Sequence, residues 1–208
     1  AISEELIEWR RDFHMHPEIG FELHRTSKIV ADELEKMGYR VKRNVGKSGV
    51  VADIGEGGKM VAIRADMDAL PILEMNESEY VSQNNGAMHA CGHDSHTAMA
   101  LGAALLLSKE KLLGRVRFLF QPCEETVDEE GKSGAQRMSD EGAMQGVDFV
   151  IAQHVDPSKP VGTISISAGP SSGGVDSWHA IIRGKGGHGA HPDKTIDPLK
   201  VLNPRLIW

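Results

Sequence analysis

A chain of 208 residues can form one large domain, or one domain and part of another. Its 40% hydrophobic and 25% charged residues are typical of a globular protein, and its net charge of -7 argues against nucleic-acid and anionic-membrane partners, which attract basic patches. No run approaches the ~18 apolar residues of a membrane span and the N-terminus has no apolar signal core, so we expect a cytoplasmic protein.

The first hundred residues are expected to alternate between helices and strands. Apolar side chains at helical spacing predict a helix over residues 3–14, capped by Ser3. A second helix is expected to begin at Thr26 or Ser27 and to stop at Gly38. Short apolar runs bounded by turn residues predict strands over residues 39–43, 50–54 and 60–65.

Two aspartates, Asp66 and Asp68, follow the third of these strands directly. Open α/β sheets place their ligands at the carboxyl ends of strands, so a functional role is one interpretation. The other is a turn in which both carboxylates accept hydrogen bonds from backbone amides. On this segment alone the two interpretations have equal support.

The most informative stretch is residues 88–96, which holds one thiol, one carboxylate and three imidazoles. These are the groups that bind zinc and related divalent ions. Cys91 and His93 stand two apart, which suits a loop better than a helix, so we place them in a loop and take Ser95 as the cap of a helix over residues 95–109. The alternative is a set of hydrogen-bonding histidines beside a structural thiol. The concentration of such groups favours metal binding.

Ligand-type residues follow two later strands as well. The strand predicted over residues 115–120 leads to Glu124 and Glu125, and adjacent carboxylates repel each other unless something compensates for them. Most such pairs are merely solvated; here one carboxylate can bind an ion while the other accepts a proton from water. After a helix over residues 134–144, a strand over residues 147–152 ends beside His154. A further strand is expected over residues 161–167, followed by a hinge over residues 169–174.

The order of these motifs resembles the M20 family of metallopeptidases. The matching segments are Arg-Ala-Asp-Met-Asp-Ala-Leu-Pro at 64–71, His-Ala-Cys-Gly-His-Asp at 89–94, Gln-Pro-Cys-Glu-Glu at 121–125, His154, and Gly-Lys-Gly-Gly-His-Gly-Ala-His-Pro at 184–192. The sequence is most similar to the amidohydrolase branch, which includes aminoacylases, hippurate hydrolases, auxin-conjugate hydrolases and thermostable carboxypeptidases. The resemblance extends from about Trp9 to Pro198.

The resemblance implies an α/β fold, with a mixed, largely parallel sheet flanked by helices as in zinc exopeptidases. Residues 1–170 would be an incomplete catalytic domain. Residues 175–208 would begin an inserted α+β lid and dimerisation domain, whose first strand would cover residues 175–187. The chain ends shortly after this lid begins, and residues 201–208 do not resemble the expected lid helix because Pro204 would break it. We therefore expect a truncated chain.

The resemblance also implies roles for individual residues. The metal ligands would be Cys91, His93, Glu125 and His154. Glu124 would be the general base, Asp68 would orient a ligand from behind it, and His188 would stabilise the oxyanion in the active site of a neighbouring subunit. Relatives usually have alanine at the position of Cys123, so this second thiol is a departure. It would either coordinate metal or pair with Cys91 when metal is absent.

The expected activity is metal-dependent hydrolysis of the amide bond of N-acyl amino acids or of C-terminal peptide residues. The substrate would carry a free carboxylate, and the protein would be a homo-oligomer. One or two divalent ions are implied; thiolate ligation makes zinc the first choice, with manganese or cobalt as alternatives. The second interpretation, from a different class, is a catalytically impaired metal-binding fragment that self-associates through exposed sheet edges.

Overall fold

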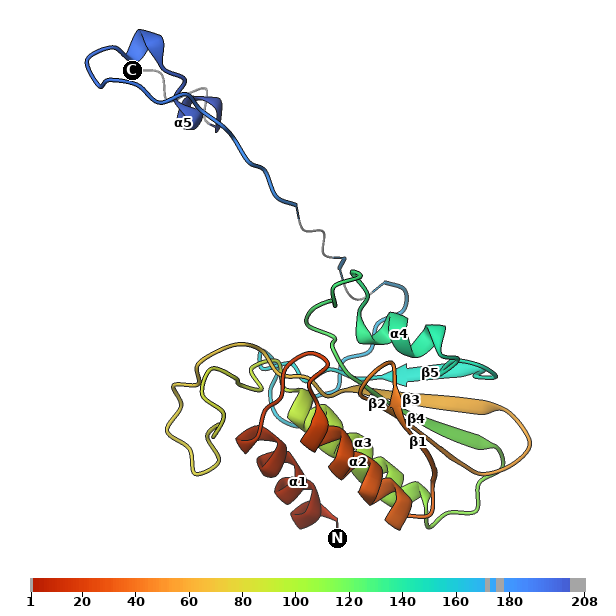
Figure 1. The fold of residues 1–208 in the computed structure, drawn as a ribbon. Helices are drawn as coiled ribbons and strands as arrows, with labels where there is room; N and C mark the ends of the chain where they lie inside the picture. The colour runs from red at the N-terminus through yellow and green to blue at the C-terminus, as the bar shows by residue number, and fades with distance from the viewer. Residues whose placement is uncertain (1, 171–172, 175–177, 203–208) are drawn as a thin grey trace. The chain divides into compact units, whose positions relative to one another are not determined.

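The computed structural model of the protein describes residues 2–170, 173–174 and 178–202. Contacts divide the chain into two compact units, Ala1–Lys159 and Pro160–Trp208. The first unit carries the sheet and its helices (Figure 1). The catalytic and lid roles expected for residues 1–170 and 175–208 stay predictions.

The first unit is a five-stranded sheet with helices on both faces. Its elements in order are α1 (Ser3–Met15), α2 (His24–Lys36), β1 (Arg40–Val45), β2 (Gly49–Ile54), β3 (Met60–Asp66), α3 (His93–Leu107), β4 (Arg115–Gln121), α4 (Gly134–Asp140) and β5 (Phe149–Ala152). The strand order is β1-β2-β4-β3-β5. The β1–β2 and β2–β4 pairs are antiparallel, whereas β3 is parallel to both β4 and β5. The predicted mixed α/β fold is confirmed, with parallel pairing in two of the four strand pairs.

Alternating side chains of the strands supply two separate cores. Phe118 and Phe120 of β4 belong to the larger core, which α1, α2 and α3 complete on one face of the sheet (Figure 1). Leu119, between them, points to the other face and packs with Met138 of α4 in a smaller core. Burial on both faces explains why β4 is a nearly continuous apolar run rather than an alternating one.

The parallel pairing aligns the carboxyl ends of the central strands. Asp66, the last residue of β3, pairs with Gln121, the last residue of β4. Arg64 of β3 pairs with Ala152, the last residue of β5. The chain therefore leaves all three strands at the same edge of the sheet, which is where the ligand-type residues follow.

The structure corrects the expected start of the second helix. This helix begins at His24, and neither Thr26 nor Ser27 caps it. The Glu18 carboxylate accepts hydrogen bonds from the backbone N–H groups of Arg25 (2.9 Å) and Thr26 (2.7 Å), so a residue outside the helix satisfies its first amides.

Two other helices differ in how they begin or end. The first helix covers the expected residues, but the residue before it is Ile2 and Ser3 makes no cap. The helix predicted over residues 134–144 stops at Asp140, followed by a turn in which Gly142 has a φ of +82°. Ser133 and Gln136 close its first turn with a capping box.

Neither of the two strands expected in the second unit is found among its described residues. Residues 161–167 form no strand, and within residues 178–187 only Lys185 makes a bridge, to Ile196. An extended segment becomes a strand only when its backbone pairs with a neighbour, and Ile164 and Ile166 are 86% and 93% exposed. Residues 175–177, where the second strand was to begin, and residues 203–208 lie outside the described residues. The described elements are a 3-10 helix, η1 (Pro192–Lys194), and α5 (Pro198–Leu202).

No described helix combines the length and apolar composition needed to cross a membrane.

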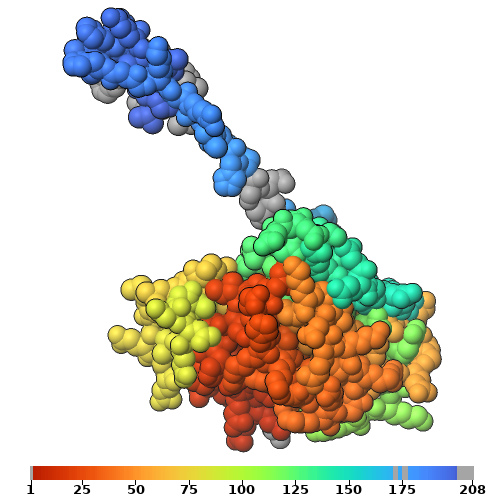
Figure 2. Space-filling model, in the orientation of Figure 1, coloured from red at the N-terminus to blue at the C-terminus, as the bar shows by residue number. Residues whose placement is uncertain are grey.

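The long loop between β3 and α3 lies against the N-terminal part of the chain (Figure 2). Buried ionic contacts join α1 to this loop and to the start of α3. His14 of α1 donates from Nδ1 to Asp94 of α3 (2.7 Å) and from Nε2 to Glu74 of the loop (3.1 Å). Both partners are carboxylates, so both ring nitrogens carry protons and the imidazole is charged. The hydrogen bond to Asp94 raises the pKa of His14 against the opposing effect of burial.

This contact predicts that stability falls as the pH rises. A raised pKa means that His14 contributes fully below its unfolded pKa of about 6.5 and loses its contribution as the pH passes the folded value. Urea unfolding should show a larger loss of free energy from about pH 6 to about pH 9 in the unmodified chain than in His14→Gln. The matched control is His24→Gln, at an exposed histidine that pairs only with exposed Glu22. Equal pH dependence in all three proteins would rule out the charged contact.

Candidate metal centre

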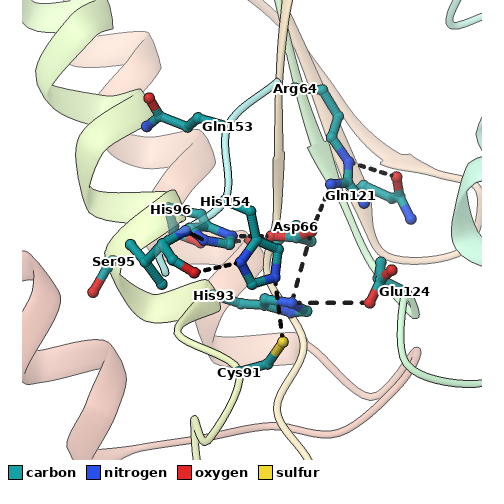
Figure 3. A network of polar contacts seen from close by, with 12 residues as sticks. Arg64, Asp66, Cys91, His93, Ser95, His96, Gln121, Glu124, Gln153 and His154 are labelled. Atoms are coloured by element: carbon teal, nitrogen blue, oxygen red, sulfur yellow. Dashed lines mark hydrogen bonds and ion pairs between the residues drawn. The ribbon is translucent and has the colours of Figure 1, made fainter. Parts of the chain in front are cut away.

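Ligand-type side chains from the ends of three strands meet at the start of α3 (Figure 3). One group consists of Cys91, His93 and His154, and a second of His93, Glu124 and Glu125. In each group the candidate ligand atoms lie within 4.8 Å of one another. The structure thus brings together all four residues that were predicted to bind metal and the predicted base, with His93 common to both groups.

His93 is the first residue of α3, and not part of a loop as expected. The helix starts two residues before Ser95 because Gly92 adopts a φ of +87°, which turns the chain into the helix directly after Cys91. Cys91 stays in the preceding loop. The predicted cap at Ser95 is therefore wrong.

The ring of His93 is oriented by the backbone of Asp68. Its Nδ1–H donates to the Asp68 carbonyl oxygen at 2.8 Å, so in the neutral ring the lone pair is on Nε2. His93 Nε2 is buried and has no hydrogen-bond partner, and the same is true of Glu125 Oε1, 3.7 Å away. Two buried polar atoms without partners are costly unless something lies between them.

A divalent cation fits these atoms. Both Nε2 of a neutral histidine and a carboxylate oxygen are good ligands for such an ion. Burial alone lowers the pKa of His93, but the surrounding carboxylates outweigh burial and raise it, so this place favours positive charge. The donor set of one thiol, two imidazoles and carboxylates is the kind that zinc prefers.

Cys91 and His154 complete the donor set from the other side. Cys91 Sγ lies 3.4 Å from His154 Nε2. His154 donates from Nδ1 to the Val155 carbonyl oxygen at 2.7 Å, which leaves its Nε2 lone pair on the side of Cys91. Burial and the neighbouring Glu125 raise the pKa of the Cys91 thiol to about 12, so a nearby cation is needed to favour the thiolate.

Asp68 holds the two glutamates in place. Its carboxylate accepts hydrogen bonds from the backbone N–H of Glu124 (2.9 and 3.0 Å) and of Glu125 (3.1 Å). The Asp68 carbonyl oxygen accepts from His93, so Asp68 contacts all three members of the second ligand group. Of the two aspartates only Asp68 accepts backbone amides, as the alternative interpretation had it, whereas the Asp66 carboxylate contacts the side chains of His96 and Arg64. The orienting role of Asp68 stays a prediction.

Glu124 differs from its neighbour in exposure and charge state. Its side chain is 40% exposed, and Oε2 lies 3.9 Å from His93 Nε2. Burial, followed by the charge of Glu125, raises the pKa of Glu124. A carboxylate with a raised pKa, open to solvent beside a candidate ion site, is suited to accept and return a proton.

Asp66 lies behind the ligand groups and stays ionised. Burial alone would raise its pKa, but the hydrogen bond from His96 and the charges of His93 and Arg64 lower it to about 2. The sequence interpretation named Asp66 and overlooked His96, which belongs to a third group of candidate ligand atoms with Asp66 and His93. Because His93 and His96 are three apart, a helix starting at residue 93 places them on one face, and this spacing was the missed signal.

Two expected contributors lie elsewhere. Cys123 is buried with a φ of +47°, its Sγ donates to the Thr126 carbonyl oxygen at 3.3 Å, and burial raises its pKa to about 11. None of the ligand groups found among the described residues includes it, and both cysteines are free thiols. His188 is exposed in the second unit, where its Nδ1 accepts from the Ala190 N–H at 3.2 Å. Its catalytic role stays a prediction.

Comparisons with known proteins agree on one family. The sequence pattern described as "Peptidase family M20/M25/M40" matches residues 62–202. Thermostable carboxypeptidase 1 of Saccharolobus solfataricus is 45% identical over 95% of this chain and 51% of its own length. The N-acyl-L-amino acid amidohydrolase of Geobacillus stearothermophilus is 43% identical over 96% of this chain and 54% of its own. The chain thus spans about half the length of these curated relatives.

A solved structure gives the same relationship. The Bacillus subtilis YXEP protein, described as a dinuclear metal binding peptidase from the M20 family, is 42% identical in sequence. The two structures superpose with a TM-score of 0.74, over 80% of this chain and 47% of that one.

The site depends on glycine at position 92. A Cβ built there would lie 2.4 Å from Val155 Cγ2, in addition to the strain of a positive φ. Gly92→Ala should therefore push away the segment that carries His154, lower the free energy of unfolding by about 1–3 kcal/mol and weaken zinc binding. Urea unfolding and zinc competition with a chelator measure these effects.

The control for this prediction is Gly57→Ala. Gly57 also has a positive φ, +61°, but a Cβ there meets nothing within 4 Å. Gly57→Ala therefore has the backbone strain of a positive φ without a steric clash, whereas Gly92→Ala has both. If Gly92→Ala binds zinc as tightly as Gly57→Ala, the close contact does not position His154.

Proposed function

Because the chain belongs to peptidase family M20/M25/M40, we propose that it carries the metal-binding catalytic part of a hydrolase that cleaves amide bonds. The substrates would be N-acyl amino acids or peptides that lose a C-terminal residue, as the names of the two curated relatives suggest. One observation carries the proposal: the unpartnered, buried His93 Nε2 faces the Glu124 and Glu125 carboxylates.

Cys91, His93, Glu125 and His154 would hold one or two divalent ions. Zinc is the first choice because the set includes a thiol, and manganese or cobalt are alternatives. A bound ion would polarise the scissile carbonyl group and lower the pKa of the attacking water toward about 7. The unmatched negative charge of the site supports such an ion.

Glu124 would move the proton. In the first step its carboxylate accepts a proton from the attacking water while the water oxygen bonds to the carbonyl carbon. In the second step the C–N bond breaks, and Glu124 returns that proton to the leaving nitrogen. The products are a carboxylic acid and a free amine. Asp68 would keep the Glu124 backbone fixed during both steps through its hydrogen bonds to the N–H group.

The remaining parts of the proposal concern the assembly. We expect a substrate with a free carboxylate, a homo-oligomer, and His188 acting on the oxyanion in a neighbouring subunit, as in the resembling dimers. A cytoplasmic location belongs to the proposal as well. These expectations rest on the family resemblance and on the sequence.

The second candidate is a non-catalytic chain that binds metal and self-associates. Strand β5 supports it, because β5 lies at the end of the strand order and Phe149, Val150 and Ile151 are 48–61% exposed. Apolar strands at sheet edges promote association. The two candidates differ in whether Glu124 is needed for turnover.

Replacing the proposed base separates the candidates. Glu124→Gln should reduce hydrolysis of an N-acylated amino acid and of a blocked dipeptide by at least about 100-fold, while zinc content changes little. The matched control is Glu129→Gln, an exposed carboxylate a few residues further along the same loop, which should keep full activity.

Two outcomes contradict the enzyme proposal. One is turnover in Glu124→Gln that equals turnover in the unmodified chain. The other is an unmodified chain that binds zinc and hydrolyses neither substrate, and this second result favours the self-associating candidate.

A further inference from the structure

A row of side chains joined by hydrogen bonds and one ion pair lies behind the proposed ligands (Figure 3). It runs from Gln121 at the end of β4, through Arg64 and Asp66 of β3, to His96 of α3. Arg64 Nε donates to Gln121 Oε1 at 2.9 Å, and Arg64 Nη1 contacts Asp66 Oδ2 at 2.6 Å. The other Asp66 oxygen, Oδ1, lies 2.6 Å from His96 Nδ1. The row ends at the backbone of Val155, the residue after His154.

Both ring nitrogens of His96 are occupied. Nδ1 must donate, because its partner is the Asp66 carboxylate, and Nε2 accepts the Val155 N–H at 2.9 Å. The ring is therefore neutral, carries its hydrogen on Nδ1 and has no lone pair left for a metal ion. Proximity to Asp66 and His93 would otherwise suggest a ligand, but the hydrogen bonds assign His96 to a different task.

His96 instead holds the backbone of Val155, which also contacts His154. The Val155 N–H is held by His96, and the Val155 carbonyl oxygen accepts the Nδ1–H of His154 at 2.7 Å. The same residue thus links the two histidines. Their rings also meet edge to face, with centroids 4.6 Å apart. Fixing Val155 fixes the tautomer and the direction of the His154 ring, whose Nε2 faces Cys91.

Arg64 keeps Asp66 available for His96. Asp66 Oδ2 lies 3.7 Å from His93 Nε2, the same distance as Glu125 Oε1, so without Arg64 this oxygen would turn toward the proposed ion and away from its present orientation. The guanidinium holds Oδ2 and is itself anchored on Gln121. Asp66 is 1% exposed, so water does not substitute for either partner.

We propose that His96 is a positioning residue, held by Asp66, Arg64 and Gln121, that sets the His154 ring for metal binding through the Val155 backbone. The inference rests on the metal site proposed above, but it concerns a residue outside the ligand set. Substitutions at His96 should therefore lower zinc affinity most. Substitutions at Arg64, which contacts Asp66 and not His96, should lower it less.

The first test uses the unmodified, metal-free chain. Long-range proton–nitrogen NMR correlations of the histidine rings should give His96 with its hydrogen on Nδ1 and an unprotonated Nε2, and the Val155 amide should exchange slowly with solvent. Adding zinc should leave this His96 pattern unchanged. A hydrogen on Nε2, or zinc-induced changes that show Nε2 bound to the ion, would overturn the proposal.

The second test uses two substitutions of His96. His96→Asn keeps a donor near Asp66 and loses the acceptor for Val155, whereas His96→Gln places an amide oxygen where Nε2 was. Zinc affinity, measured by competition with a chelator, should fall about 10–100-fold in His96→Asn. His96→Gln should recover part of it, together with slow exchange of the Val155 amide. His24→Asn, at an exposed histidine, should behave like the unmodified chain.

The readouts separate the two proposals. If the unmodified chain binds no zinc, the metal site is wrong, while the tautomer and amide exchange in the metal-free chain still decide whether His96 holds Val155. If the chain binds zinc and His96→Asn stays within about threefold of it, the positioning role is wrong and the metal site stands. The NMR result on the unmodified chain also decides the matter if a variant fails to fold.

Discussion

Parallel pairing of β3 with both β4 and β5 is the constraint on which the candidate site depends. It brings the carboxyl ends of three strands to one edge, so Asp66, Glu124 and His154 approach one another although they are far apart in sequence. Apolar side chains on both faces of β3 and β4 hold these two strands in that register, and α3 packs across them so that its first residue, His93, faces the same edge. The core thus determines the geometry of the site.

The site concentrates negative charge in a place with limited access to water. Asp66 and Asp68 are each 1% exposed, and Glu125 has a buried oxygen without a partner. Backbone amides and His96 satisfy part of this charge, and the neutral form of His93 offers a lone pair at Nε2. A cation is the simplest group that satisfies the remaining atoms together. Burial and, after it, the same charge raise the pKa of Glu124, which links the proposed metal site to the proposed base.

The sequence predicted the strand ends well because ligand-type residues directly follow apolar runs. Asp68, Glu124, Glu125 and His154 were located in this way, and the family resemblance was confirmed. The start of α3 was predicted two residues late, since Ser95 is a good cap and nothing local reveals the positive φ of Gly92. With a helix starting at Ser95, His93 and His96 did not fall on one helical face, so His96 was not recognised as part of the site. The strand predicted over residues 161–167 failed because pairing depends on a neighbour that local pattern does not specify.

X-ray absorption at the zinc edge tests the central claim most directly, on the chain loaded with one equivalent of zinc. The account predicts one sulfur ligand, from Cys91, at about 2.3 Å, together with nitrogen and oxygen ligands at about 2.0–2.2 Å. The sulfur signal should disappear in Cys91→Ser and persist in Cys123→Ser, because Cys123 lies outside the ligand groups. A zinc ion without a sulfur ligand, or one whose sulfur comes from Cys123, would contradict the assignment.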